Sequence, residues 1–167
     1  MSTYETMSLH LETERLTLRP WAESDADDLR ALHSERGNGT PTVEHARALI
    51  AKQLTATAAT GIALLPVQRR GEGDFIGYCG LTVGRAALRE PGIAYELFRR
   101  AHGRGHAAEA AHAVLAAAAA TGRTRLWATV GTGNTPSFRV LAKPGFERRH
   151  VAVDDRGEHV WLTRSLP

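Results

Sequence analysis

The stretch that decides the fold is Tyr95–Ala110, which reads YELFRRAHGRGHAAEA. A strand-like segment runs into a turn with two glycines, Gly103 and Gly105, and a helix of small residues follows at once. The first turn of a helix offers free backbone N–H groups and partial positive charge, and glycines let a phosphate approach them without obstruction from a Cβ atom. Three arginines add positive charge nearby: Arg99, Arg100 and Arg104. The stretch therefore predicts a pyrophosphate-binding turn, with a plain structural turn as the alternative.

Two common phosphate-binding motifs do not fit this turn. A P-loop requires GxxxxGK followed by serine or threonine, and the sequence contains no such string. A dinucleotide-binding turn requires GxGxxG near the start of an alternating β-α series, and the third glycine is missing here. The turn therefore matches neither of these nucleotide-binding classes.

The hydrophobic pattern around this stretch predicts the element order β-α-α-β-β-β-α-β-α-β-β. The expected strands are Leu11–Pro20, Ile62–Arg69, Phe75–Val83, Gly92–Phe98, Leu126–Val130, Phe146–Val153 and His159–Ser165. The expected helices start at a Ser24/Asp27 capping box, at Thr42, at the glycine-rich turn, and at Thr135 followed by Pro136. Because hairpins come first and two β-α passages follow, we predict a mixed α/β or α+β domain rather than a doubly wound nucleotide fold.

The chain has 167 residues and a mass of 18.1 kDa, the size of one ordinary domain. It is 43% hydrophobic and 23% charged, which suits a packed core and argues against disorder and a coiled coil. We expect Met1–His10 to be a flexible leader and residues 11–167 to form a single domain. The sequence shows no secretory signal and no apolar stretch long enough to span a membrane, so we expect a cytoplasmic protein without a membrane partner.

The net charge and the residues able to bind metals indicate which classes of ligand the protein can bind. The formal net charge of +3 and pI of about 9.5 suit an anionic small molecule, and no basic run with interleaved aromatics supports nucleic-acid binding. The one cysteine, Cys79, excludes an internal disulfide and a multi-cysteine zinc site. His102, His106 and Glu109 match no known metal motif and are interpreted as part of a solvated loop. We therefore predict no metal.

A second informative stretch is Asn134–Phe146, which reads NTPSFRVLAKPGF. Asn134 stands at a strand-to-helix junction, where its amide can bind a ligand or cap the helix. Ser137 lies in the first turn, with a hydroxyl that can donate to a partner in the same cleft. Taken alone, helix capping explains both residues.

The two stretches in this order resemble the GNAT superfamily of acetyl-CoA-dependent N-acetyltransferases. The first resembles motif A, R/Q-x-x-G-x-G/A after a strand, and the second resembles a motif B of the form N-x-x-S-x-x-V-L-x-K-x-G-F. The string TERLTLRP at Thr13–Pro20 is similar to the opening of the subgroup that contains the ribosomal-protein alanine N-acetyltransferases. Phe75–Leu81, FIGYCGL, resembles a strand of the same subgroup. The resemblance covers roughly residues 11–166.

The resemblance implies a mainly antiparallel twisted sheet of about seven strands with a splayed centre, flanked by about four helices. It implies that acetyl-CoA is the cosubstrate and that a primary amine receives the acetyl group by direct attack. The residues that it assigns to acetyl-CoA binding are Leu97, Phe98, Arg99, His102, Gly103, Arg104, Gly105, His106, Ala107, Asn134 and Ser137. Ser137 also occupies the place of a proposed general acid near the departing thiolate.

Some positions depart from the family pattern. Many relatives carry E-x-G-Y on the fourth strand, with a glutamate that faces the amine, whereas this chain has Gly92 at that place. Glu96 has the same strand parity as Gly92 and is the candidate general base. Because the usual glutamate is missing, a non-catalytic acyl-CoA-binding module is the alternative function. The acceptor, a protein N-terminus or a small amine, and the oligomeric state, including a homodimer, stay open.

Overall fold

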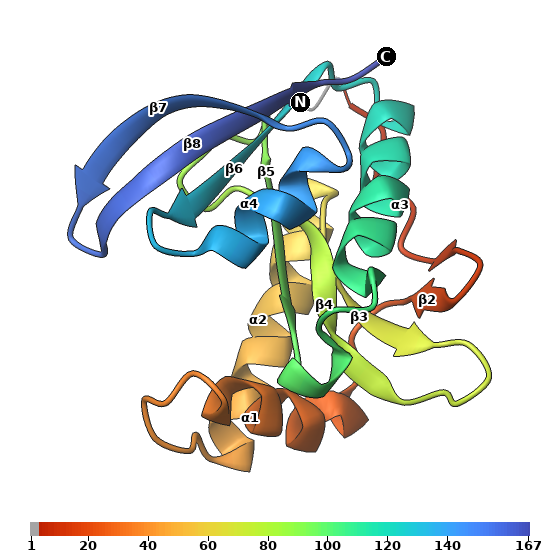
Figure 1. Ribbon diagram of the computed structural model, residues 1–167. Coiled ribbons are helices and arrows are strands. Elements are labelled where there is room, and N and C mark those ends of the chain that lie inside the picture. Colours follow the sequence, from red (N-terminus) through yellow and green to blue (C-terminus); the bar gives the residue numbers. More distant parts are fainter. Residues whose placement is uncertain (1–3) are drawn as a thin grey trace.

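One sheet of eight strands organises residues 4–167, which the computed structural model describes (Figure 1). The strands are β1 (Leu11–Glu12), β2 (Leu16–Leu18), β3 (Leu64–Arg69), β4 (Phe75–Thr82), β5 (Gly92–Leu97), β6 (Arg125–Gly131), β7 (Glu147–Asp154) and β8 (Gly157–Ser165). They lie in the order β1-β2-β3-β4-β5-β6-β8-β7. Every neighbouring pair is antiparallel except β5 and β6, which are parallel. The mixed, mainly antiparallel sheet expected from the sequence is confirmed.

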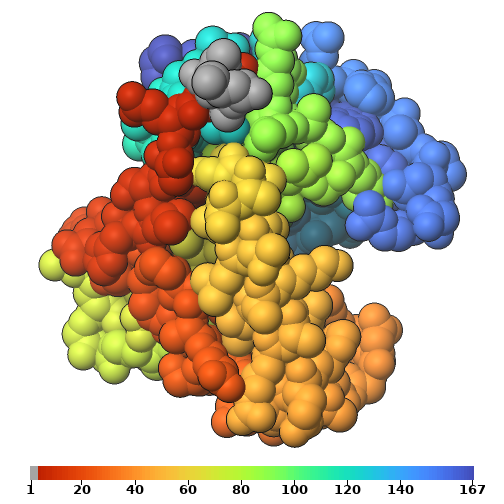
Figure 2. All heavy atoms as spheres, turned by 180° about the vertical axis from the view of Figure 1, so that it is seen from behind, coloured from red at the N-terminus to blue at the C-terminus, as the bar shows by residue number. Residues whose placement is uncertain are grey.

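Helices cover both faces of the sheet. The described residues form α1 (Ala26–Ser34), α2 (Val43–Thr60), α3 (His106–Ala120) and α4 (Thr135–Ala142), with short 3-10 turns η1 (Glu23–Asp25) and η2 (Arg99–Ala101). In Figure 1, α3 and α4 lie in front of the sheet, and Figure 2 shows α2 running over the opposite face. Fully buried alanines let α3 lie close to the strands: Ala110, Ala111 and Ala118. The sheet is thus the middle layer between two helical layers.

The sheet opens at its centre, between β5 and β6. These strands pair at one position, Gly92 with Trp127, next to a hydrogen bond from the Trp127 amide to the Pro91 carbonyl (3.0 Å). Beyond Gly92 the strands separate toward their carboxyl ends, and the segments that follow those ends lead into α3 and α4 (Figure 1). In sheets with parallel strands, ligands bind in the crevice beyond the carboxyl ends. The predicted splayed centre is confirmed.

The expected first strand, Leu11–Pro20, is wrong in one respect, because the segment forms two short strands that pair as a hairpin. The chain turns at Thr13, whose amide donates to the Leu16 carbonyl (2.9 Å). The Thr13 hydroxyl also binds the carboxylate of Glu109 on α3 (2.5 Å), a contact that no local pattern reveals. The sheet therefore has eight strands rather than about seven.

The starts of the first two helices test the predicted caps. Thr42 caps α2 as predicted, since its hydroxyl accepts a hydrogen bond from the amide three residues on (3.1 Å). The prediction of a capping box formed by Ser24 and Asp27 is wrong. The carboxylate of Asp25 instead accepts the amide of Ala22 (2.8 Å), so the helical segment begins as the 3-10 turn η1 before α1.

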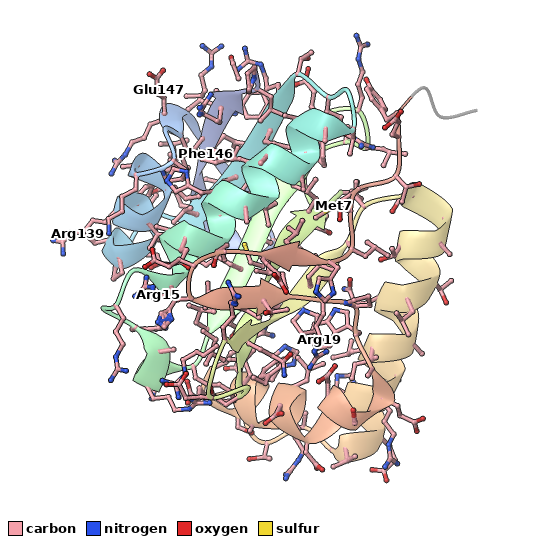
Figure 3. All side chains as sticks on the ribbon, turned by 90° about the vertical axis from the view of Figure 1, so that its right-hand side faces the viewer. Met7, Arg15, Arg19, Arg139, Phe146 and Glu147 are labelled. Carbon is pink, nitrogen blue, oxygen red and sulfur yellow. The ribbon has the colours of Figure 1, made fainter. Side chains whose placement is uncertain are left out.

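Residues 4–10, which belong to the expected leader, pack against the domain. The Glu5 amide donates to the Thr121 carbonyl (3.1 Å), and the Met7 amide donates to the Gly61 carbonyl (2.8 Å). Met7 belongs to this segment, and its side chain is buried in the domain (Figure 3). The first three residues of the expected leader lie outside the described residues. Within the described part of the chain, no helix has the length and apolar character needed to cross a membrane.

Candidate active site

A cavity of about 510 Å³ lies where β5 and β6 separate, between the start of α3, the start of α4 and the loop after α1. Its lining includes most of the residues predicted for the site: Glu96, Leu97, Arg99, His102, Gly103, Gly105, His106, Ala107, Asn134 and Ser137. Two predicted residues do not line it. Phe98 is buried against the aromatic ring of Phe75, and the Arg104 carbonyl accepts a hydrogen bond from Arg15 (2.9 Å). The fold thus gathers in one cavity residues from two separate motifs.

The start of α3 forms a cradle of backbone N–H groups. Gly103 and Gly105 both have left-handed backbone angles, with φ values of +76° and +80°, and Gly105 immediately precedes the first helical residue. Such angles strain any residue with a Cβ atom. A Cβ atom on Gly103 would meet nothing within 4 Å, so the loop surface is open. The cradle can therefore accept an anionic group on its exposed side.

A buried histidine adds an unused polar atom to this cradle. His106 is the first residue of α3 and its side chain is 6% exposed, yet its Nδ1 atom has no hydrogen-bond partner. Burial, together with the charges of nearby arginines such as Arg15, lowers the pKa of His106, so the ring is neutral at neutral pH. Because Nδ1 is shielded from solvent, a phosphate oxygen can reach it only after the ring turns. The interpretation of His106 as part of a solvated loop is therefore wrong.

Contacts from the N-terminal hairpin hold the cradle in place. Glu109, in the first turn of α3, forms an ion pair with Arg15 (2.7 Å) and accepts from the hydroxyl of Thr13 (2.5 Å). Figure 3 shows Arg15 beside the start of α3. Burial acts to raise the pKa of Glu109, but the hydrogen bonds from Thr13 and Arg15 outweigh it and lower the pKa. The sequence does not predict the contact between Arg15 and Glu109, because the two residues are 94 positions apart in the chain.

Two of the three arginines near the turn are held by carboxylate-bearing residues. The backbone N–H of Arg99 donates to the carboxylate of Glu35 (2.9 Å), and its guanidinium donates to the Glu35 carbonyl (2.6 Å). Arg100 forms an ion pair with Asp74 (2.8 Å). These arginines fix the end of β5 to the loop after α1 and to the β3–β4 turn.

Ser137 lies next to a tyrosine at the point where the strands separate. The hydroxyl oxygens of Tyr95 and Ser137 are 2.5 Å apart. Asn134 accepts a hydrogen bond from the Ser137 amide (3.4 Å) and is the N-cap of α4, so the predicted cap at Thr135 is wrong. Burial raises the pKa of Tyr95 and outweighs the opposing hydrogen bond of Ser137, so the phenol is protonated at neutral pH. The pair can pass a proton from one hydroxyl to the other.

Glu96 points toward the other face of the sheet, where α1 and α2 lie. Arg36, in the loop after α1, binds its carboxylate with two nitrogens (2.9 and 2.5 Å), and the Tyr78 hydroxyl donates to it (3.0 Å). Burial acts to raise the pKa of Glu96, but the hydrogen bonds and charge of Arg36 outweigh it, so the pKa is lowered. Glu96 is therefore ionised at neutral pH. Arg36 escaped the sequence analysis because it is 60 residues away in the chain.

A second cavity of about 310 Å³ meets the first at three shared residues: Tyr95, Asn134 and Ser137. It is lined by Gly92 and by Trp127, which points away from α3 because its neighbours in β6 are buried beneath that helix. The split in the sheet can thus be reached from both faces. Within residues 4–167, no group of three or more His, Cys, Asp or Glu side chains is placed to hold a metal ion.

Comparison with known proteins identifies the family. Residues 15–147 match the family model described as the acetyltransferase (GNAT) domain, and this match spans most of the chain. The chain therefore belongs to the GNAT acetyltransferase family. A search of curated proteins found no match.

Solved structures of acetyltransferases share this fold. A GnaT-family acetyltransferase from Bordetella pertussis is 26% identical, with a TM-score of 0.81 over 94% of this chain and 99% of that chain. The ribosomal-protein-S5-alanine acetyltransferase from Vibrio fischeri is 17% identical, with a TM-score of 0.79 over 95% and 97%. RimJ from Mycobacterium smegmatis, solved in complex with CoA-disulfide, is 22% identical, with a TM-score of 0.76 over 90% and 81%. The resemblance to this family, with ribosomal-protein acetyltransferases among the structural neighbours, is confirmed.

Proposed function

We propose that this protein transfers the acetyl group of acetyl-CoA to a primary amine by direct attack of the amine nitrogen. One observation carries the proposal. The open cradle at the start of α3 and the paired hydroxyls of Tyr95 and Ser137 line the same cavity, at the split of the sheet. A phosphate-binding end and a proton-donating end in one cavity suit a long thiol ester. The complex of the structural neighbour RimJ with CoA-disulfide supports this assignment.

The cradle residues fit the anionic end of acetyl-CoA. Free amides of the first turn of α3 and the open surface at Gly103 hold the pyrophosphate. The backbone of Leu97 and Arg99, with Asn134, meets the pantetheine arm. Acetyl-CoA supplies an acetyl thioester, and the chain supplies binding, orientation and protons.

Ser137 acts on the leaving group. As the nitrogen–carbon bond forms and the carbon–sulfur bond breaks, the Ser137 hydroxyl donates its proton to the sulfur. Tyr95, 2.5 Å away and protonated at neutral pH, returns a proton to Ser137, and solvent returns one to Tyr95 once the products leave. The Phe98 and Arg99 N–H groups already donate to Ile76 and Glu35. The proposed donor to the charge on the thioester oxygen is therefore the backbone N–H of Leu97, which lines the cavity. This arrangement makes Ser137 the general acid of the proposal.

Glu96 takes the proton that the amine loses. Two carboxylates line the larger cavity, those of Glu35 and Glu96, and Glu96 is the one carried by β5, directly after Tyr95. Glu96 is ionised at neutral pH and faces the side of the sheet from which the second cavity opens. Its ion pair with Arg36 makes it a weak base, so it serves best through a bridging water or for an amine that arrives partly neutral.

The test is a thiol-release assay with acetyl-CoA and a panel of primary amines, run beside calorimetric binding of CoA. Amine-dependent release of free thiol, matched by the acetylated amine, supports the transferase. Binding of CoA without release for any amine supports a non-catalytic acyl-CoA-binding module, which Gly92 favours because it stands where relatives carry a glutamate. The cytoplasmic location and the homodimer stay predictions.

A further inference from the structure

The smaller cavity is the route by which an acceptor can reach the shared hydroxyls. If acetyl-CoA lies along the start of α3, it fills the larger cavity up to Tyr95 and Ser137. The smaller cavity reaches the same two residues past Gly92 and Trp127, on the face opposite α3. The walls of the smaller cavity therefore decide which amine arrives at the thioester.

The charged side chains that line this cavity are all cationic. Arg85 and Arg156 line it, and no aspartate or glutamate does so among residues 4–167. Arg85 is held by Thr129 (2.9 Å) and by the carboxylate of Asp154 (2.7 Å), which offsets part of its charge. In Figure 2 the loop that carries Arg85, between β4 and β5, lies beside the β7–β8 hairpin. The Arg85 guanidinium therefore links Asp154 and Thr129 at the wall of the cavity, and the Arg156 guanidinium is the second cation of the lining.

Arg156 keeps its charge available. Its backbone N–H donates to Asp154 (2.9 Å), but its guanidinium has no hydrogen bond or ion pair within the described part of the chain. Arg85 is paired with Asp154, and Glu90 binds the Trp127 indole N–H from behind the wall (2.8 Å). Among the described residues, the unpaired charge that lines the cavity is therefore the Arg156 guanidinium. Such a charge attracts an anionic group and repels a second ammonium. The cavity thus disfavours diamines and polyamines as acceptors.

The remaining walls combine aromatic and aliphatic side chains with polar ones, and they leave room for a compact body. The rings of Trp127 and Trp161 pack edge to face, with centroids 5.7 Å apart. A Cβ atom on Gly92 would stand in ordinary contact with the Thr82 carbonyl (3.5 Å), so the missing side chain enlarges the cavity without strain. A volume of about 310 Å³ is at the small end of ligand pockets. The space suits a small flat molecule.

From these walls we infer that the acceptor is a small amine with a flat or apolar body and an anionic group, a carboxylate or a phosphate, which Arg156 and Arg85 recognise. This inference rests on the proposed acetyl transfer. It distinguishes the protein from an enzyme for polyamines and from one that needs a long peptide.

The test uses four acceptors, three of which share one ring and one aminomethyl group. They are para-(aminomethyl)benzoate, para-(aminomethyl)benzamide and para-xylylenediamine, together with a neutral alanine-initiated peptide amide. Thiol release at equal concentrations gives kcat/KM for each. We expect the carboxylate to exceed the carboxamide by about fivefold or more, a difference typical of an exposed charge pair, and the diamine to be slowest.

Variants of Arg156 and Arg85 test whether these arginines cause the preference for the carboxylate over the carboxamide. Arg156→Gln lowers the preference for the carboxylate over the carboxamide to near unity. Arg85→Gln uncovers the carboxylate of Asp154, which then offsets the charge of Arg156, so the preference again falls to near unity. Arg89→Gln is the matched control, since Arg89 is an exposed arginine of the same loop that does not line the cavity. Circular dichroism checks that each variant folds.

Each possible result of these assays either supports or overturns the inference about the acceptor. Equal or faster transfer to the carboxamide, the diamine or the peptide overturns the inference but leaves the acetyl transfer standing. Transfer to none of the four overturns the inference, and CoA binding measured on the same sample then shows whether the acyl-CoA-binding module remains. A preference that survives Arg156→Gln and Arg85→Gln also overturns it.

Discussion

Replacing Gly105 with valine tests whether the start of α3 binds the pyrophosphate. Gly105 has a φ of +80°, and a Cβ atom there would lie 3.4 Å from the Arg15 guanidinium. A β-branched residue in this left-handed conformation costs about 1–2 kcal/mol of stability and pushes the first turn of α3 out of position. It also places methyl groups on the surface that a phosphate would touch. We expect the affinity for CoA to fall at least about tenfold, roughly 1.4 kcal/mol.

The control separates loss of the cradle from loss of stability. Gly71, in the β3–β4 turn, has a φ of +91° and nothing within 4 Å of a Cβ atom, and it does not line either cavity. Gly71→Val therefore carries comparable backbone strain without touching the start of α3. Calorimetric titration with CoA and thermal unfolding are run on both variants. Unchanged affinity in a folded Gly105→Val protein, or an equal loss in Gly71→Val, would refute the reasoning.

Three further predictions follow from the site and its surroundings. Ser137→Ala lowers kcat by about 100-fold while the affinity for acetyl-CoA changes little, because a donor to the leaving sulfur acts in the transition state; a change in KM alone would make Ser137 a capping residue. Glu96→Gln flattens the acidic limb of the kcat/KM profile against pH, and an intact limb would show that the amine loses its proton without Glu96. Asp154, whose pKa the hydrogen bond from Arg85 lowers to about 2, stabilises the fold above its unfolded pKa of about 3.9, and this stabilisation is lost as pH falls toward 2. Denaturant unfolding should therefore show Asp154→Asn to be less stable than wild type at neutral pH, with a gap that closes in acid; a gap that stays constant would contradict this.

Local patterns in the sequence were sufficient for most elements of the fold. The β3–β4 hairpin with its glycine-containing turn, the glycine-rich start of α3 and the Thr42 cap of α2 each depend on residues within a few positions of one another. Such signals survive in a single sequence, since period and capping are set by neighbours along the chain. The hairpin of β7 and β8, which turns between Asp154 and Gly157, was predicted for the same reason.

Errors and omissions came from contacts between distant residues. The strand expected at Leu11–Pro20 divides because Thr13 bonds Glu109 on α3. The ionisation of Glu96 depends on Arg36 and Tyr78, which come from a loop and a neighbouring strand. No spacing rule connects such partners, because only the folded sheet brings them together. The motifs predicted the residues of the candidate site, and long-range packing sets the charges of the cavity that they line.

The most direct test of the central claim follows the acetyl group itself. The protein is incubated with acetyl-CoA that carries carbon-13 in the acetyl group and with para-(aminomethyl)benzoate, and the products are identified by mass spectrometry. The account predicts that the label moves to the amine nitrogen, in an amount equal to the free thiol released, and that Ser137→Ala slows this transfer. Labelled acetate in place of a labelled amide, or intact acetyl-CoA bound by a protein that acetylates no amine, would contradict it.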